Sequence, residues 1–307
     1  MAILAVGSVA FDAIKTPYGK VDKVLGGSAT YFSLAASYFT QPRIVAVVGQ
    51  DFTPEHEDLL KRRGICTKGI EHAAGQSFFW SGEYGENVNE AKTHRTDLNV
   101  FENFNPRIPE DYLGSEFLFL ANIDPVLQAK VRRQITGARL VGGDTMNFWI
   151  NGKQQELKET LKTIDVLLIN DGEARALAGE SSLPRAARQV LAMGPKALVI
   201  KHGEYGATMF FRDGMFGTDR QAFRAPALPI EDVVDPTGAG DSFAGGFMGY
   251  LASQDELNRE TFKRAMFYGG VMGSFAVERF GPERLTQLTR ADIDARFQRL
   301  RELTHLD

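Results

Sequence analysis

The segment DPTGAGDSFAGGF, residues 235–247, combines several glycines with one carboxylate at the expected start of a helix. Gly238, Ala239 and Gly240 would present successive backbone N–H groups at a helix N-terminus, where the helix dipole favours an anion such as phosphate. Glycine suits such positions because a side chain would block close approach of the anion. Asp241 follows directly, and its carboxylate would repel a phosphate unless its role is to accept a proton. An anion site beside a general base predicts phosphoryl transfer to an alcohol.

Two other phosphate-binding patterns do not fit this segment. The dinucleotide pattern G-x-G-x-x-G requires a third glycine where the chain has Phe243, and the Walker triplet G-K-[ST] occurs nowhere in the sequence. A structural role for Asp241, in which the carboxylate only complements the positive end of the helix, stays open at this point.

The elements that must position these residues alternate between short apolar runs and longer helical patterns. The sequence predicts strands at 2–7, 44–48, 117–121, 138–142, 165–169 and 197–201, and helices near 28–39, 54–63, 125–136, 153–163, 183–193, 241–253, 259–279 and 290–303. Such alternation is typical of βαβ units and predicts an α/β fold with a mostly parallel sheet covered by helices. Ligands bind such sheets beyond the carboxyl ends of the strands.

One region departs from this alternation and predicts a small β-rich lid. Residues 76–84 and 91–100 have the pattern of two antiparallel strands joined by the polar turn 85–90, and residues 12–25 predict a second irregular ribbon. An ordinary surface hairpin is the alternative. Because successive strand side chains point to opposite faces, one face of the first strand would carry Phe78, Trp80, Gly82 and Tyr84.

DPTGAGDSFAGGF closely resembles the C-terminal signature of the ribokinase, or phosphofructokinase-B (PfkB), family of ATP-dependent kinases, and further landmarks follow in the family's order. The resemblance implies a ribokinase-like three-layer α/β/α sandwich, with residues 1–307 as one kinase domain and a lid formed by about 12–25 and 76–100. It also implies that Asp241 is the catalytic base and that ATP and Mg²⁺ are cofactors. The anion hole for the γ-phosphate would be formed by the amides of Gly238, Ala239 and Gly240.

The resemblance extends to the nucleotide side of the site. Asn170 and Glu173, in INDGEA, resemble an N-x-x-E element that organises Mg²⁺, with Glu173 acting through water; a helix N-cap is the structural alternative. KHGEYG, residues 201–206, resembles a nucleotide loop that would contribute Lys201, Gly203 and Gly206. Family positions near the nucleotide also correspond to Thr237, Phe275 and Ala276, the last two in the wall of the adenine pocket. The family's monovalent-cation site, here for K⁺, corresponds to Asp235, Thr237, Ala276, Arg279 and Gly281, with Arg279 and Gly281 contributing backbone carbonyls.

On the acceptor side, Asp12 resembles the family acid that holds sugar hydroxyls, which suits a carboxylate because it accepts two hydrogen bonds. GGSATY, residues 26–31, resembles the acceptor loop and would contribute Gly26, Gly27, Ser28 and Tyr31. Relatives that bind ribose or phosphorylated sugars often have Lys and Asn where this chain has Ser28 and Tyr31. The missing lysine argues against a phosphorylated sugar. Phe78 and Trp80 are predicted to stack on a nucleobase or cover a sugar ring, or else to pack the lid or a second subunit, so a sugar and a nucleoside both stay open as acceptors.

Composition limits the remaining possibilities. The formal net charge of −4 over 307 residues predicts neither nucleic-acid nor membrane partners, and a single cysteine, Cys66, excludes an intramolecular disulfide and indicates a cytoplasmic protein. Relatives often pair their lids, so a homodimer is expected. Two alternative functions are a vitamin kinase of the hydroxymethylpyrimidine or pyridoxal type and a non-catalytic nucleotide or sugar sensor.

Overall fold

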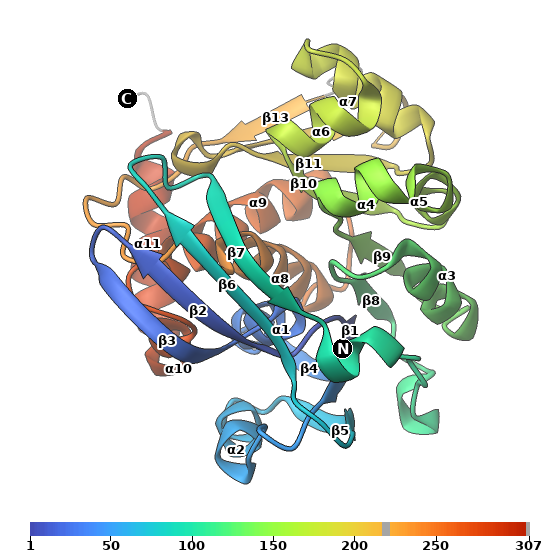
Figure 1. Cartoon of the computed structure of the whole chain (residues 1–307). Coiled ribbons are helices and arrows are strands. Elements are labelled where there is room, and N and C mark those ends of the chain that lie inside the picture. Colours follow the sequence, from blue (N-terminus) through green and yellow to red (C-terminus); the bar gives the residue numbers. More distant parts are fainter. Residues whose placement is uncertain (217–221, 305–307) are drawn as a thin grey trace.

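The computed structural model describes residues 1–216 and 222–304, which form a nine-stranded sheet and a four-stranded sheet (Figure 1). The strand order of the large sheet is β13-β12-β11-β10-β9-β8-β1-β4-β5. Its strands are β1 (Ala2–Val6), β4 (Gln41–Val48), β5 (Cys66–His72), β8 (Phe117–Leu120), β9 (Leu140–Gly143), β10 (Val166–Asn170), β11 (Ala197–Lys201), β12 (Ala207–Phe211) and β13 (Ala222–Ala225).

The large sheet is mostly parallel, as predicted. Among the described strands, those from β11 across to β5 run parallel, and β12 and β13 add an antiparallel edge. The sequence did not predict β5, β12 or β13. The chain winds from β1 outward to β5 and then from β8 outward in the other direction. The boundary between β1 and β8 is therefore a topological switch point, where such sheets bind ligands.

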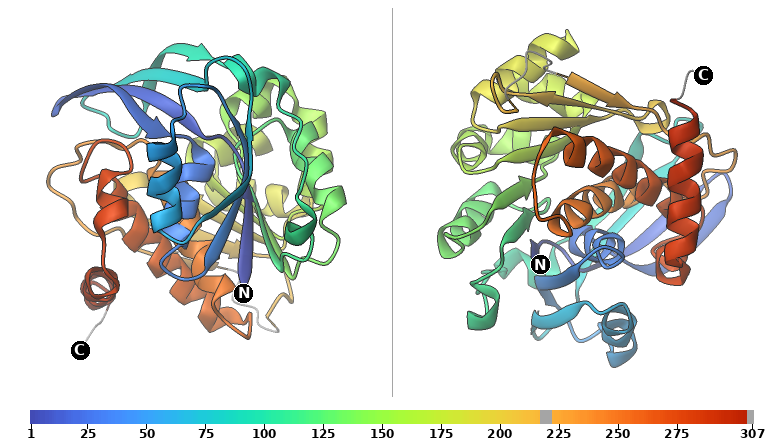
Figure 2. Two further views of the ribbon diagram at one scale, coloured as in Figure 1. Left: turned by 90° about the horizontal axis from the view of Figure 1, so that it is seen from below. Right: turned by 180° about the vertical axis from the view of Figure 1, so that it is seen from behind.

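Helices cover both faces of the large sheet, which confirms the three-layer architecture (Figure 2). Alternate strand residues enter different cores: Ile3 and Ala5 of β1 pack toward one face, and Leu4 and Val6 toward the other. The first core takes side chains from α1 (Ser28–Ala36), α2 (Pro54–Arg62), α8 (Ala239–Ala252), α9 (Arg259–Ala276), α10 (Glu283–Gln287) and α11 (Arg290–Glu302). The second core takes side chains from α3 (Pro125–Gln134), α4 (Asn147–Gly152), α5 (Gln154–Leu161), α6 (Asp171–Ala178) and α7 (Leu183–Ala192). Short 3₁₀ helices are η1 (Asn99–Asn103), η2 (Glu110–Tyr112) and η3 (Gly203–Tyr205).

The small sheet is built from the hairpin predicted at 76–100 and from a second hairpin, where the sequence predicted only an irregular ribbon over 12–25. Its order is β3-β2-β6-β7, formed by β2 (Ala10–Thr16), β3 (Gly19–Gly26), β6 (Phe78–Tyr84) and β7 (Ala91–Asp97). Within each hairpin the strands are antiparallel, and β2 pairs with β6 in parallel. This pairing places Asp12 opposite Trp80, so the two side chains share one face of the small sheet.

The β2–β3 hairpin is held against the C-terminal part of the chain. The Thr16 hydroxyl donates a 2.8 Å hydrogen bond to the Val234 carbonyl. A Cβ built on Gly281 would lie 2.3 Å from Val24 Cγ2, so the glycine allows β3 to approach the loop after α9 closely.

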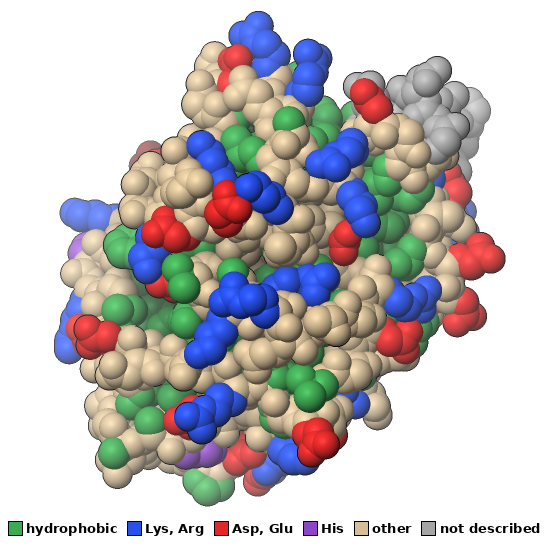
Figure 3. Space-filling view, turned by 90° about the vertical axis from the view of Figure 1, so that its right-hand side faces the viewer, with side chains coloured by type: hydrophobic (Ala, Val, Ile, Leu, Met, Phe, Trp, Pro, Cys, Tyr) green, Lys and Arg blue, Asp and Glu red, His purple; other side chains and the backbone are tan. Residues whose placement is uncertain are grey.

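The surface agrees with the modest net charge of the chain. On the face shown in Figure 3, basic side chains are interspersed with acidic and neutral ones. Within the described residues, no helix has the length and apolar character that a membrane crossing requires.

Candidate active site

The predicted site residues lie where several chain segments meet at the carboxyl edge of the large sheet. Asp12 lies in β2, the strand that follows β1; Asn170 ends β10, Lys201 ends β11, and Asp241 lies in the first turn of α8. The site therefore collects residues from distant parts of the sequence at the edge expected for an α/β sheet.

Asp12 is packed tightly against the acceptor loop. Its side chain is 5% exposed, and a Cβ built on Gly26 would lie 1.9 Å from its Oδ2, which explains the need for glycine there. Gly27 has a φ of +94°, and a Cβ on it would lie 2.5 Å from the Ser8 carbonyl oxygen. Burial, with additional repulsion from Asp235 and Asp241, raises the pKa of Asp12 to about 8. No described residue donates a hydrogen bond to Asp12, so its carboxyl oxygens are free to bind a ligand.

Ser28 and Tyr31 both lie near the site, but the Ser28 hydroxyl is hydrogen-bonded whereas the Tyr31 hydroxyl is not. Ser28 and Ser8 exchange hydrogen bonds: the Ser28 N–H donates to Ser8 Oγ at 3.0 Å, and the Ser8 N–H donates to Ser28 Oγ at 3.2 Å. This exchange fixes the start of α1. The Tyr31 ring packs on Gly238, where a Cβ would lie 2.3 Å from the ring, and its buried hydroxyl has no hydrogen-bond partner among the described residues. Burial, followed by repulsion from Asp235 and Asp12, raises the pKa of Tyr31.

The start of α8 has the geometry of an anion site, with one difference from the sequence prediction. Gly238 is the N-cap residue with a φ of +73°, a conformation that favours glycine. The Ala239 N–H donates a 3.2 Å hydrogen bond to the Pro236 carbonyl, so a tight turn already uses this predicted donor. The N–H groups of Gly238, Gly240 and Asp241 have no partner within the described residues and stay available to an anion.

Asp241 belongs to a group of four interacting charges. Burial, with repulsion from Asp144, raises its pKa to about 7, while Lys201 partly offsets the increase. Lys201 Nζ lies 3.5 Å from Asp144 Oδ2 and would lie 2.9 Å from a Cβ on Gly240, so its ammonium group is close to the anion site. Burial lowers the pKa of Lys201, but attraction from Asp144, Glu173 and Asp241 outweighs burial and raises it. The lysine therefore stays charged beside the free amides.

Asn170 and Glu173 form the helix cap that the structural alternative predicted. The Glu173 N–H donates to Asn170 Oδ1 and the Asn170 N–H donates to Glu173 Oε2, each at 2.8 Å, which makes a capping box at the start of α6. Burial and repulsion from Asp144 raise the pKa of Glu173 to about 7. Glu173 thus has a structural function and also faces the charged group.

No group of three or more potential metal ligands lies together among the described histidine, cysteine, aspartate and glutamate residues. The acids Asp144, Glu173 and Asp241 interact electrostatically without forming a coordination cage. Such an arrangement fits a Mg²⁺ ion that keeps most of its waters and is held mainly by phosphate oxygens, because Mg²⁺ dehydrates reluctantly.

The loop after β11 turns through two glycines with positive φ. Gly203 has a φ of +56° and Gly206 a φ of +92°. A Cβ on Gly206 would lie 2.2 Å from the Ala225 carbonyl oxygen, so this glycine allows β13 to pack against the loop. Lys201 connects the loop to the anion site. Contact of this loop with a nucleotide stays a prediction.

In this structure Phe78 and Trp80 of β6 make contacts within the lid and with η1. The Phe78 ring stacks on Phe101 at 5.5 Å, as hairpin packing predicts. Trp80 is half-buried, lies over Gly82, and donates from Nε1 to Thr93 Oγ1 at 3.2 Å. A role for Phe78 and Trp80 in acceptor binding stays a prediction.

The residues predicted for K⁺ come together, but Asp235 already has backbone partners. Asp235 is 0% exposed and accepts hydrogen bonds from the N–H groups of Thr237, at 2.9 Å, and Gly281, at 2.8 Å. Burial raises its pKa, an effect that these two amides oppose. The Arg279 side chain is exposed and donates to the Glu278 carbonyl. The carboxylate therefore ties the segment before α8 to the loop after α9.

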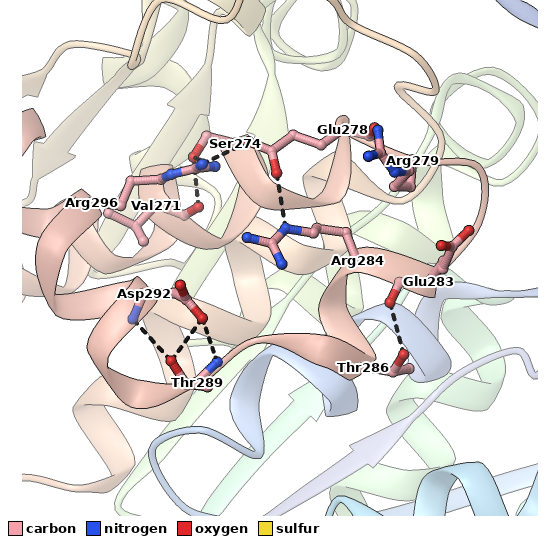
Figure 4. Close-up of polar contacts among 10 residues, drawn as sticks. All are labelled: Val271, Ser274, Glu278, Arg279, Glu283, Arg284, Thr286, Thr289, Asp292 and Arg296. Carbon is pink, nitrogen blue, oxygen red and sulfur yellow. Dashed lines mark hydrogen bonds and ion pairs between the residues drawn. The ribbon is translucent and has the colours of Figure 1, made fainter.

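Phe275 and Ala276 are each 1% exposed. The Arg296 guanidinium lies 3.5 Å from the centre of the Phe275 ring and that of Arg284 lies 5.2 Å away, and both arginines bind the Glu278 carboxylate (Figure 4). Phe275 is thus a core residue that anchors α11 and α10 to α9. In this structure neither Phe275 nor Ala276 presents side-chain surface to a nucleotide.

Sequence reasoning missed Asp144, which follows β9. Its carboxyl group is 6% exposed, accepts a 2.7 Å hydrogen bond from the Thr145 N–H, and interacts with Lys201. Burial raises its pKa, while Lys201 has the opposite effect. The only sequence signal was an acid two residues after the predicted strand 138–142. Two large apolar side chains follow it in sequence, Met146 at 40% exposed and Phe148 at 65%.

Comparison with known proteins identifies the family. The pattern described as "pfkB family carbohydrate kinase" matches residues 2–287. A cytidine kinase of Thermococcus kodakarensis is 28% identical over 256 residues, which cover 80% of this chain and 87% of the relative. A ribokinase of Staphylococcus aureus is 30% identical over 246 residues, covering 76% and 72%. The fold is similar to the crystal structure of a nucleoside kinase from Methanocaldococcus jannaschii, with a TM-score of 0.76, 20% identity, and coverage of 97% and 98%.

Proposed function

The chain belongs to the PfkB family of carbohydrate kinases, phosphotransferases with hydroxyl acceptors, and we propose that it transfers the γ-phosphoryl group of ATP to the primary hydroxyl of a nucleoside. The observation that carries the proposal is the geometry at the start of α8. There, free amides and the Lys201 ammonium group adjoin a carboxylate that accepts no hydrogen bond from the described residues.

In the proposed reaction, Asp241 accepts the proton of the acceptor hydroxyl. The hydroxyl oxygen forms a bond to the γ-phosphorus, the bond between this phosphorus and the β–γ bridging oxygen breaks, and ADP leaves with the electron pair. The amides of Gly238 and Gly240, with Lys201, stabilise the negative charge on the transferring group. Phosphoryl transfer depends mainly on such positioning and charge stabilisation.

Mg²⁺, when bound with ATP, would neutralise charge on the phosphate oxygens. Glu173 and Asp144 are the acids of this chain that would hold waters of its hydration shell. Glu173 already donates its N–H to Asn170 and accepts from the Asn170 N–H, so its carboxylate is held in a fixed position. The small sheet, which carries Trp80 on the face of Asp12, would act as a lid that excludes water from the reacting groups.

Asp12 would accept hydrogen bonds from the acceptor's secondary hydroxyls, because its oxygens are free and Gly26 allows backbone approach. Two features favour a nucleoside. The first is the similarity to a cytidine kinase over 80% of this chain; the second is Ser28 in place of a lysine that a phosphorylated sugar would require. A free sugar is the second candidate, supported by the similarity to a ribokinase.

The test is ADP release with ATP and Mg²⁺ across cytidine, adenosine, inosine, guanosine, ribose and fructose. We expect turnover with at least one nucleoside, and kcat/KM at least ~10-fold above that for either sugar, the effect of about 1.4 kcal/mol of differential binding. Activity restricted to sugars would contradict the nucleoside proposal and favour the second candidate.

The role of Asp241 is tested separately with the Asp241→Asn variant. Loss of a general base lowers kcat by about 10²-fold or more, while binding of ATP changes little because the amides and Lys201 are intact. Asp22→Asn is the matched control, since the Asp22 side chain is 88% exposed on β3 and its ion pair is with Lys20. Equal turnover in Asp241→Asn and the control would remove Asp241 from the mechanism.

A further inference from the structure

The turn of the lid, residues 85–90, lies against the loop after β11. A Cβ built on Gly203 would lie 2.0 Å from Asn89 Oδ1 and 2.8 Å from Asn89 Cγ. The Asn89 side chain therefore fills the space that any side chain at position 203 would need. Its amide has no hydrogen-bond partner among the described residues, and both its N–H₂ and its carbonyl are free to bind a ligand.

A second contact joins the end of β6 to the segment before α8. The Thr237 hydroxyl donates a 3.3 Å hydrogen bond to the Tyr84 hydroxyl oxygen, and Thr237 directly precedes the N-cap residue Gly238. Tyr84 is half-buried there, and burial raises its pKa to about 12. The hairpin that covers the acceptor residues is thus joined at its far end to both segments assigned to the nucleotide.

We propose that Asn89 and Tyr84 are positioning residues that couple closure of the lid to nucleotide binding. The Asn89 amide, seated on Gly203, donates a hydrogen bond to the bound nucleotide, so the closed lid favours nucleotide binding and the nucleotide favours the closed lid. Because such coupling is reciprocal, the acceptor and the nucleotide each increase the affinity for the other. This inference rests on the proposed function for the identity of the two ligands.

The fluorescence of Trp80 can be used to follow the conformation of the lid. The chain has two tryptophans, and the other, Trp149, lies on α4. In a Trp149→Phe background, Trp80 fluorescence is titrated with Mg²⁺ and AMP-PNP, a non-hydrolysable ATP analogue, with and without saturating cytidine. We expect AMP-PNP alone to change the Trp80 signal. We also expect cytidine to lower its dissociation constant by about 5-fold or more, the lower end of typical coupling.

Asn89→Ala and Tyr84→Phe in this background test the contacts. We expect each to reduce the cytidine effect to less than about 2-fold, while the dissociation constant without cytidine changes by less than about 3-fold. Glu86→Ala is the matched control in the same turn, since Glu86 is exposed and has no hydrogen bond or ion pair within the described residues. Coupling that is unchanged in both test variants would overturn the proposal.

Steric evidence comes from Gly203→Ala. Its Cβ meets the Asn89 amide, so the single variant should lose the coupling, and Asn89→Ala should relieve the collision in the double variant. Because Asn89→Ala removes coupling as well, the informative quantity is the AMP-PNP dissociation constant without cytidine. It should rise in Gly203→Ala and fall back toward the background value in the double variant. Because Gly203 has a φ of +56°, part of the rise comes from backbone strain that both variants share, and only the difference between them measures the collision. Equal values would show that contact with Asn89 does not contribute to nucleotide affinity.

Failure of the proposed function is distinguishable from failure of this inference. If neither cytidine nor any other nucleoside is phosphorylated, the nucleoside proposal is wrong, yet the response of Trp80 to AMP-PNP alone still tests the lid contact. The inference is supported if AMP-PNP changes Trp80 fluorescence in the background protein and this change is smaller by at least about half in Asn89→Ala. Losing one of the two contacts makes the closed lid less favourable relative to the open lid. No response in the background protein, or the same response in Asn89→Ala, overturns it.

Discussion

Asp241 is the residue whose protonation should control the rate. Burial raises its pKa to about 7, so near neutral pH part of the enzyme carries the protonated, inactive form. A base must be ionised to accept a proton, and we therefore expect kcat/KM to rise with pH through about 7 and to level off above about 8. The measurement is the pH–rate profile of the free enzyme with the best acceptor. A profile that is flat or falls between pH 6 and 8 would contradict the assignment.

Lys201→Met provides the matched variant for this profile. The lysine charge lowers the pKa of Asp241, so its removal should move the rising limb to higher pH. The apparent value belongs to the interacting group of Asp144, Glu173, Lys201 and Asp241 and is shared among them. The direction of the movement is therefore the quantity to compare.

Asp12 should reduce the stability of the folded protein at alkaline pH. Its pKa rises to about 8 on folding, from an ordinary value of 3.8, so the unfolded chain ionises it first. Stability linked to this group is complete below about pH 4 and is lost as pH rises through about 8. Asp12→Asn avoids this loss, and at pH 8.5 we expect a free energy of unfolding higher by about 1 kcal/mol or more.

Denaturant unfolding at pH 4.5 and 8.5 measures this effect. The advantage of Asp12→Asn should be several-fold smaller at the lower pH, and the exposed control Asp22→Asn should show no such dependence. If Asp12→Asn raises the free energy of unfolding equally at both pH values, the gain has a cause other than ionisation of Asp12.

At the scale of elements, glycines set the contact between α1 and α8. A Cβ on Gly245 would lie 2.2 Å from the Phe32 carbonyl oxygen and 2.8 Å from Ala35 Cβ. Gly245→Ala must push the two helices apart, and we expect a loss of about 2 kcal/mol or more in the free energy of unfolding. Because α1 and α8 carry Tyr31 and Asp241, kcat should fall too.

Gly152→Ala is the control, since Gly152 ends α4 and a Cβ there meets nothing within 4 Å. It should change stability by less than about 1 kcal/mol and leave kcat near the wild-type value. Chemical denaturation and initial rates measured on both variants decide the point. Equal stability of the two variants would mean that the helices accommodate the extra methyl group.

The sequence predicted those elements that have a strong local pattern. The apolar runs at β1, β8 and β11 and the alternating pattern of β6 were sufficient to predict these strands, because buried strand positions require apolar residues. β12 and β13 escaped prediction because they form the antiparallel edge of the sheet, where pairing with β11 and with each other, rather than a continuous apolar run, determines the strands. α6 was expected only as an alternative explanation of Asn170, although its capping box is clear in the structure.

Site prediction had a similar limit. The glycines and the acid of the 235–247 segment were identifiable because a continuous stretch of chain carries them. Asp144 was not, since its importance comes from contact with Lys201, which lies 57 positions further along the chain but only 3.5 Å away. That Ala239 uses its N–H within a turn also depends on backbone geometry that residue types do not specify.

At the scale of the whole molecule, Glu278 links three helices. Arg284 of α10 binds its carboxylate at 3.0 Å and Arg296 of α11 at 2.6 Å, and Arg296 also covers Phe275 of α9. Glu278→Ala would leave a guanidinium that is only 13% exposed without its acidic partner. We expect a loss of about 2 kcal/mol or more in the free energy of unfolding, because an uncompensated buried charge is costly.

Glu260→Ala is the control for an ion pair at the surface, since Glu260 is 71% exposed and binds Lys263 at 2.6 Å. It should cost less than about 0.5 kcal/mol. Chemical denaturation of the two variants in parallel gives the comparison. Losses of equal size would show that Glu278 behaves as an ordinary surface carboxylate.

The attachment of the small sheet affects how substrate and product exchange with solvent. Its β2–β3 hairpin is held by the Thr16–Val234 hydrogen bond and by the close packing of Val24 on Gly281. The β6–β7 hairpin is attached through Tyr84 and Asn89, and the residues of β7 are exposed along nearly the whole strand. If the lid opens by pivoting about the β2–β3 hairpin, the contacts of Tyr84 and Asn89 must break and the displacement is greatest at β7. We then expect bulky substitutions on β7 to slow the exchange of substrate and product before they affect the reacting groups.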